Sequence, residues 1–391
     1  MGLAKGAYLK RITTATMGQA REVDRNLEGS SPPSVFIGSW NYPRVYAGPL
    51  IAPVHGECGI MDSPESWIPG CLSQEDILSF RLGLVRGKRM QEVTDTGTPF
   101  VEKLQEIALS AGSIQSEATF QDRPRGCSFG EEHTPFGPSG NLESFEAESG
   151  RWEPRLERCY QDTDLLAADG IMELHESGVP FTSIQKALSV GALGSGERRR
   201  LVPTRWAITA CDTTIADRLL AGVRKNPVID AVRVHQFTSL HNHYAVILLP
   251  TAWTYEWTEA FLHILGNEEV VFSDYEGERG KKGYSTVGGC YYSCKMAVLE
   301  SLASQGVQAG AIVLREARRP YIPLGVFNVR ENVRSAMHQP CTEFEDLRSA
   351  LAHIAPSMDL PMERFVREGT LLRDQLRERQ TTLDTFIKKG D

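Results

Sequence analysis

The residues with the most specific spacing stand near the end of the chain. Gln380 is followed by an aliphatic residue three positions later and by two apolar residues at positions six and seven: Leu383, Phe386 and Ile387. In one tight helical turn these three side chains project from the same side. They suit an apolar pocket on a partner, with the amide of Gln380 at its rim. Soluble, charged flanks predict that 379–391 is a flexible tail that folds on binding.

This tail resembles the PIP box, the peptide by which many replication and repair proteins bind the sliding clamp PCNA. The usual motif prefers two aromatic residues at its end, and Ile387 departs from that pattern. The resemblance implies PCNA as a partner. The alternative is that the same residues close a terminal amphipathic helix on the protein's own core.

A second group of residues suits phosphate chemistry. Four arginines lie between a glycine-rich turn and Trp206: Arg198, Arg199, Arg200 and Arg205. A guanidinium group can bind two phosphate oxygens at once, and an aromatic ring is a stacking surface for an unpaired base. The segment 197–206, read as a basic turn, therefore predicts a DNA contact. The alternative is an exposed charged turn with Trp206 in the core.

Further cations in the second half of the chain are interpreted as DNA contacts. They are Lys281, Lys282, Arg315 and Arg330. The two lysines precede a Gly288-Gly289 step, which opens an expected helix whose free amide groups also suit an anion. The whole chain has 42 Lys and Arg against 50 Asp and Glu, a net charge of -8. This excludes a protein coated in positive charge but leaves room for a local basic groove, because phosphates respond to nearby charges.

Candidate catalytic residues are few. Asp212, Asp274 and Glu276 lie near expected strand ends, where a nuclease would hold Mg²⁺ through carboxylates. Nothing in their spacing separates them from ordinary solvated acids, so the catalytic residues stay unassigned. The sequence contains no P-loop, GxGxxG or GxSxG motif, which argues against ATP-driven, Rossmann and hydrolase enzymes.

The cysteines and the hydropathy pattern bear on metals and compartment. The eight cysteines include no CxxC pair, whereas zinc ribbons need two close ligand pairs, so no such metal site is expected. Cys290 and Cys294 are interpreted as small buried hydrophobic residues. No membrane-spanning stretch or leader is evident, and we expect a soluble, cytoplasmic protein with reduced thiols.

The elements around these residues belong to both structural classes. Ser73 and Asp76 have the form of a capping box at the start of a helix. Further helices are predicted over 100–109, 162–178, 181–187, 212–223, 291–302 and 327–337, and strands over 228–237, 244–249, 270–275 and 310–315. Residues 121–155 are predicted as a long irregular loop. The fold class is therefore α+β, with two closely packed parts, a mixed sheet and surrounding helices.

Several longer blocks resemble the archaeal Nre family of DNA-repair proteins. They include SPPSVFIG at 31–38, DSPE at 62–65, LVPTRWAITA at 201–210, GGCYY at 288–292 and PLGVFNVRE at 323–331. The resemblance implies an N-terminal region over 12–278, a C-terminal region over 279–378, a role in tolerance of DNA damage and a terminal PCNA-binding peptide. Some members carry an N-terminal zinc-binding cysteine cluster, which this chain lacks. No catalytic residue is carried over.

The leading hypothesis is a repair factor that binds damaged or branched DNA through an arginine-lined groove and is recruited to PCNA by its tail. Tethering raises the effective concentration of the second contact, with gains of about 10²- to 10⁴-fold. Two alternatives stay open. One is an enzyme, either a metal-dependent nuclease or a base- or nucleotide-modifying repair enzyme. The other is a non-catalytic, clamp-bound adaptor.

Overall fold

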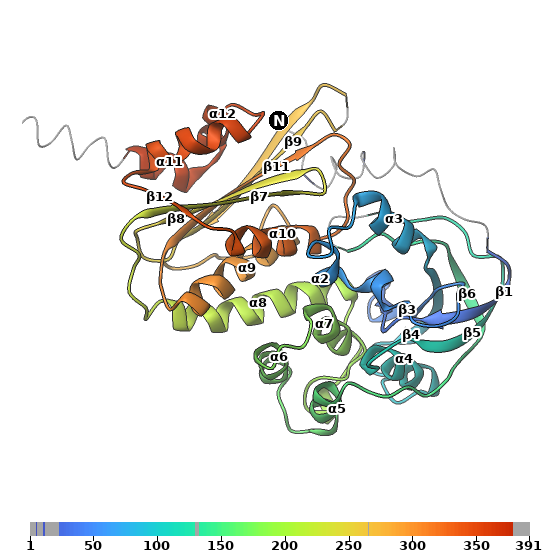
Figure 1. The fold of residues 1–391 in the computed structure, drawn as a ribbon. Helices are drawn as coiled ribbons and strands as arrows, with labels where there is room; N and C mark the ends of the chain where they lie inside the picture. The colour runs from blue at the N-terminus through green and yellow to red at the C-terminus, as the bar shows by residue number, and fades with distance from the viewer. Residues whose placement is uncertain (1–4, 6–10, 12–22, 130–132, 265, 378–391) are drawn as a thin grey trace, which may run out of the picture. The chain divides into compact units, whose positions relative to one another are not determined.

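The chain forms two compact units, each built around its own sheet. The computed structural model describes residues 5, 11, 23–129, 133–264 and 266–377. The N-terminal unit consists of Thr13–Ile215 with Pro323–Phe327, and the C-terminal unit of Met1–Ile12, Ala216–Ile322 and Asn328–Asp391. Both sheets are six-stranded and mixed, with helices packed beside them (Figure 1), so the predicted α+β class is confirmed. The division of the sequence at 278 and 279 stays a prediction.

The sheet of the N-terminal unit has the order β1-β5-β6-β4-β3-β2. Its strands are β1 Asn26–Ser31, β2 Val35–Ile37, β3 Arg44–Ile51, β4 Val85–Glu92, β5 Ile114–Phe120 and β6 Ser139–Ala147. Neighbours are antiparallel except β4 and β6, which run parallel. The loop prediction for 121–155 was wrong, because this segment contains β6. Hydrogen bonds from the preceding strand β5 and from β4, which is distant in sequence, stabilise a strand that its own residues signal weakly.

The helices of this unit include η1 Gly59–Asp62, α2 Pro64–Trp67, α3 Gln74–Gly83, α4 Pro99–Leu109, α5 Pro154–Gln161, α6 Ala167–Glu176, α7 Phe181–Ser189 and η2 Gly196–Arg198. Of these, α4 and α7 match the predicted ranges 100–109 and 181–187 closely. The predicted capping box is confirmed: the Ser73 hydroxyl accepts from the Asp76 amide at 3.1 Å, and the Asp76 carboxylate accepts from the Ser73 amide at 3.0 Å.

Two predicted boundaries were wrong. The helix expected from residue 162 begins only at Ala167, because the Asp162 carboxylate accepts from the amides of Asp164 and Leu165 and forms a turn first. In contrast, α8 runs over Thr204–Val223 and starts well before residue 212. The predicted basic turn therefore ends at Pro203, whose carbonyl accepts from the Ala207 amide at 2.9 Å.

The sheet of the C-terminal unit has the order β10-β9-β11-β8-β7-β12, with β11 parallel to β9. Its strands are β7 Val232–Ser239, β8 Asn242–Leu249, β9 Tyr255–Leu262, β10 Glu269–Glu276, β11 Gly310–Arg318 and β12 Thr342–Phe344. Every residue of β8 is buried, which confirms the buried strand predicted over 244–249. A continuous apolar run is what a strand covered on both faces requires.

Helices cover both faces of this second sheet. They are α9 Gly289–Gln305, α10 Phe327–His338, α11 Leu347–Ile354, η3 Ala355–Ser357 and α12 Met362–Glu368. In Figure 1, α11 and α12 lie on one side of the sheet, where Leu351 and Phe365 pack against the buried strand residues. Cys290 and Cys294 are buried in α9, as predicted. Among the described helices, none combines the length and the apolar composition needed to cross a bilayer.

Candidate nucleic-acid interface

Three large aromatic side chains are exposed on the N-terminal unit. Trp40 is 79% exposed, Tyr42 45% and Trp206 41%. The ring centroids of Tyr42 and Trp206 are 5.0 Å apart, and Trp40 lies two residues before Tyr42 in the β2–β3 turn. Trp206 is thus exposed, not in the core. We call these three residues the aromatic surface. Exposed rings of this kind are suited to stacking against bases.

The aromatic surface is assembled from segments that are far apart in sequence. The β2–β3 turn meets the start of α8 where the Ile37 amide donates to the Thr204 hydroxyl at 3.0 Å. This contact places Trp206, in the first turn of α8, beside Tyr42. The helix begins directly after Pro203, whose ring fixes its backbone φ and whose carbonyl accepts the first helical hydrogen bond from the Ala207 amide.

The predicted arginines of 198–205 have different surroundings. Arg198, Arg200 and Arg205 are exposed, and Arg205 directly precedes Trp206. Arg199 is half-buried and donates to the carbonyls of Gly194 at 2.8 Å and Asp162 at 3.1 Å. Arg199 therefore holds its own loop together, while Arg205 lies next to the aromatic surface.

The predicted cations of the C-terminal unit are mostly engaged within it. Lys282 is exposed, but Lys281 donates to the Asp274 carboxylate at 2.5 Å. Arg315 is 1% exposed and Arg330 2%, and the guanidinium group of Arg315 donates to Glu259 at 2.9 Å. A buried guanidinium group needs such a partner to offset its desolvation. Arg315 and Arg330 therefore do not present their charge to a phosphate here.

The predicted catalytic acids also have internal surroundings. Asp212 is buried in α8. Asp274 accepts from Ser285 at 2.6 Å and from the Thr286 amide at 3.0 Å. Burial alone would raise the pKa of Asp274, but the hydrogen bonds from Lys281, Ser285 and Thr286 outweigh it and lower that pKa.

Glu276 lies on the same face of β10 as Asp274 and is also paired. It accepts from the Trp253 indole at 3.0 Å and from Lys295 at 2.8 Å. Within the described ranges, no three His, Cys, Asp or Glu side chains gather as a metal ion would require. The Mg²⁺ site of the nuclease alternative thus gains no support from these acids.

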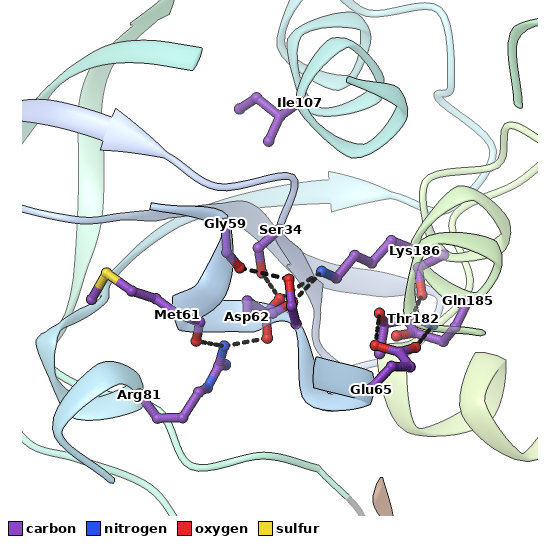
Figure 2. A network of polar contacts seen from close by, with 12 residues as sticks. Ser34, Gly59, Met61, Asp62, Glu65, Arg81, Ile107, Thr182, Gln185 and Lys186 are labelled. Atoms are coloured by element: carbon purple, nitrogen blue, oxygen red, sulfur yellow. Dashed lines mark hydrogen bonds and ion pairs between the residues drawn. The ribbon is translucent and has the colours of Figure 1, made fainter. Parts of the chain in front are cut away.

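A buried polar network around Asp62 was not anticipated from the sequence (Figure 2). The Asp62 carboxylate, in η1, accepts from Ser34, Arg81 and Lys186, the last at 2.7 Å. Burial by itself would raise the pKa of Asp62, but the charges of Arg81 and Lys186 outweigh it and lower that pKa. The network ties η1 to α3 and α7. No local motif marks this network in the sequence, because Arg81 and Lys186 come from α3 and α7.

Beside this network lies a cavity of about 430 Å³, a volume within the range of small-molecule sites. Its acidic wall groups already accept protein hydrogen bonds. Glu65 accepts from the Thr182 amide at 2.6 Å at the start of α7, and Glu57 accepts from the Ser113 amide at 3.0 Å. The carboxylates of Glu57 and Glu65 therefore serve to hold the unit together, and we do not count them as ligand-binding groups.

The Asp62 network extends toward a segment that covers the sheet. Arg81, whose guanidinium group binds Asp62, donates from Nε to the Pro135 carbonyl at 3.0 Å. This bond fixes the segment that carries His133 and Phe136. The ring of Phe136 lies 4.6 Å from that of Phe36 in β2, edge to face. The buried Asp62–Arg81 ion pair thus helps to position the ring of Phe136 against Phe36 of β2.

Comparison with known proteins decides the family. Residues 1–264 match the family model described as archaeal Nre, N-terminal, and residues 276–386 match archaeal Nre, C-terminal. The chain belongs to the Nre family. It is 36% identical over 372 residues to the DNA repair protein NreB of Archaeoglobus fulgidus, covering 93% of each chain. It is 30% identical over 365 residues to the DNA repair protein NreA of Haloferax volcanii, covering 88% of this chain and 86% of that one. No solved structure matches it.

Most of the Nre-like blocks quoted above converge in the N-terminal unit. The block at 31–38 forms β2, the block at 62–65 carries Asp62, and the block at 201–210 carries Arg205 and Trp206. The predicted Nre tail, from Gln380 through Leu383 and Phe386 to Ile387, lies outside the described residues. Its binding to PCNA stays a prediction.

Proposed function

We propose that this Nre protein is a DNA repair factor that binds DNA through the aromatic surface and Arg205, and that its tail holds it at PCNA. The relatives named DNA repair proteins, similar over nearly their whole length, support the repair role. The observation that carries DNA binding is the exposed Tyr42–Trp206 pair beside an exposed arginine.

The chemistry of this pair favours DNA with unpaired bases. In a duplex each base is stacked on its neighbours and its faces are hidden, whereas an unpaired base can stack on a protein ring. Such stacking contributes about 1–3 kcal/mol per base. A neighbouring guanidinium group can hold the phosphate of the same strand. We therefore expect single-stranded DNA, flaps or lesions with displaced bases to bind more tightly than intact duplex.

Fluorescence polarisation with single-stranded, duplex and flap DNA at two salt concentrations tests this function. Trp206→Ala and Tyr42→Ala should each weaken single-strand binding about 5- to 150-fold, the equivalent of one lost stacking contact. Tyr275→Ala is a matched control, because Tyr275 is also exposed (42%) but lies on the C-terminal unit. It should bind like the parent protein.

Two results would contradict the proposal. The first is no DNA binding by the parent protein at low salt, which would favour the clamp-bound adaptor. The second is parental affinity in both aromatic variants. Cleavage or modification of the labelled DNA, seen on a denaturing gel, would instead support the repair-enzyme alternatives.

A further inference from the structure

Two cations of β4 lie on aromatic rings of the N-terminal unit. The guanidinium carbon of Arg86 is 4.5 Å from the ring centroid of Phe36 and 4.8 Å from that of Phe136. The ammonium nitrogen of Lys88 is 5.6 Å from the ring centroid of Tyr46. Residues two apart on a strand share a face, so both cations belong to one surface of the sheet. Their positions on the strand are about 6.8 Å apart.

Within the described residues, neither cation has an acidic partner. In the same part of the chain, no hydrogen-bond partner reaches the buried Nε atom of Arg86. No hydrogen bond or ion pair in the described part of the chain engages the charged group of either residue. Burial lowers the pKa of Arg86 to about 10; burial and then the charge of Arg86 lower the pKa of Lys88. Uncompensated like charges held together cost free energy, which an incoming anion would relieve.

The β4 cations and the aromatic surface both lie against the β2–β3 hairpin. Phe36 immediately precedes Ile37, whose amide binds Thr204 at the start of α8. Tyr46 belongs to β3 of the same hairpin, and its carbonyl accepts from the Gly38 amide at 2.7 Å. Arg205 is close enough that its charge, with that of Arg86, lowers the pKa of the buried His133. The β2–β3 hairpin therefore carries rings of both groups, Phe36 and Tyr46 beside the β4 cations and Tyr42 beside Trp206. We call the two groups together the track.

We propose that Arg86 and Lys88 bind successive backbone phosphates of a single DNA strand whose bases stack on Tyr42 and Trp206. This inference rests on the proposed function and adds the kind of ligand the sheet surface takes. The guanidinium and ammonium groups on the β-strand would bind the phosphates of the DNA backbone, while the rings at the hairpin would stack against the bases. Such a site would recognise the charge and flexibility of a single DNA strand and would not distinguish one base sequence from another.

The salt dependence of binding measures each phosphate contact. For single strands, log K falls against log salt concentration with a slope of about -0.7 per phosphate contact. With a 5′-hydroxyl oligothymidylate, Arg86→Gln and Lys88→Gln should each make the slope shallower by about 0.7 and weaken binding at low salt. Arg86→Lys should restore most of the slope, because it keeps the charge. Trp206→Ala should lower affinity and leave the slope unchanged.

Arg151→Gln is the matched control. Arg151 is exposed, and its carbonyl accepts from the Ala111 amide just after α4. The substitution therefore removes one positive charge at a position that is not part of the track. It should keep the parental slope. Thermal melting of each variant shows whether the fold is intact, and recovery in Arg86→Lys separates loss of charge from loss of folding.

The outcomes separate this inference from the proposed function. If the parent protein binds no DNA, the proposed function itself fails. If it binds DNA and the slopes of Arg86→Gln and Lys88→Gln match the parental slope, the phosphate track is wrong while DNA binding stands. A slope change confined to 5′-phosphorylated strands would also overturn it, because the site would then bind a terminal phosphate. Equal slope changes with and without the 5′-phosphate support the backbone assignment.

Discussion

The buried carboxylate of Asp62 affects both the stability of the N-terminal unit and the position of the segment that carries His133 and Phe136. This carboxylate forms ion pairs with both Arg81 and Lys186, which are themselves buried. Removing one member of a buried ionic group leaves its partners charged and unpaired inside the protein, which costs about 3–5 kcal/mol. Arg81 also donates a hydrogen bond to the carbonyl of Pro135, in the segment that carries His133 and Phe136. Loss of Asp62 is therefore expected to disturb the sheet surface as well as stability.

We expect Asp62→Asn to lower the free energy of unfolding of the N-terminal unit by about 3–5 kcal/mol at pH 7. Because the folded pKa of Asp62 is lowered, its contribution is present above the unfolded value and is lost as pH falls through the folded value. Urea unfolding should therefore show the gap to the parent closing in acid. Asp24→Asn is the control, since its pair with Arg123 is exposed and contributes little. A constant gap down to the lowest pH would contradict the electrostatic cause.

His133 provides a second test at the residue scale. Burial lowers its pKa to about 4, and the charges of Arg86, Arg81 and Arg205 act in the same direction. The unfolded histidine titrates near 6.5, so between these values the unfolded chain binds the extra proton. Stability should then fall by about 3 kcal/mol as pH drops from 6.5 to 4. His133→Gln should flatten this dependence in urea titrations, whereas the exposed His55→Gln should keep it.

At the scale of elements, a glycine far along the chain makes room for the His133 segment. Gly325 has a φ of +96°, and a Cβ there would lie 2.5 Å from the His133 carbonyl carbon. Both the backbone conformation and the space exclude a side chain. The block at 323–327 thus belongs to the N-terminal unit, although more than a hundred residues separate it from the rest of that unit.

Gly325→Ala is therefore expected to destabilise the N-terminal unit by at least about 1 kcal/mol, because alanine is strained at this φ and meets backbone atoms. Chemical denaturation monitored by tryptophan fluorescence measures the change. Gly97→Ala is the control: nothing lies within 4 Å of its Cβ position. That variant should stay within about 0.5 kcal/mol of the parent. Similar losses in both variants would argue against the close approach of Gly325 to His133.

Elements were predictable where their signals were local. The capping box of Ser73 and Asp76 and the apolar run of β8 depend on residues that are neighbours in sequence. The strand β6 was missed because its pairing partners are distant, and α8 was started too late because a basic stretch was read as a turn. Tertiary contacts override weak local preferences in both cases.

At the scale of the whole molecule, the proposed function combines two modest contacts. The chain carries a net charge of -8, so the proposed DNA binding would rest on a local surface and not on long-range attraction. A second attachment through PCNA would raise the local concentration of DNA, with a gain of about 10²- to 10⁴-fold. Neither contact then has to be tight by itself.

Deletion of 380–391 should abolish retention on a PCNA column while leaving the melting temperature and the affinity for free DNA unchanged. Phe386→Ala should have nearly the same effect, because it removes the largest apolar side chain of the predicted peptide. Lys388→Ala, just outside the apolar set, is the control. Full retention of the deletion variant would refute the tail assignment, and a lowered melting temperature would favour its packing on the protein's own core.

The α+β class, the family and several helices and strands could be predicted from the amino-acid sequence alone. These features depend on local periodicity, capping and contiguous blocks of residues. The structure alone decided which cations have an acidic partner: Arg315 pairs with Glu259, whereas Arg86 lies between two phenyl rings without an ion-pair partner among the described residues. Residue type reports a charge, but only the packing of distant segments decides whether that charge is neutralised inside the protein or left to meet a ligand.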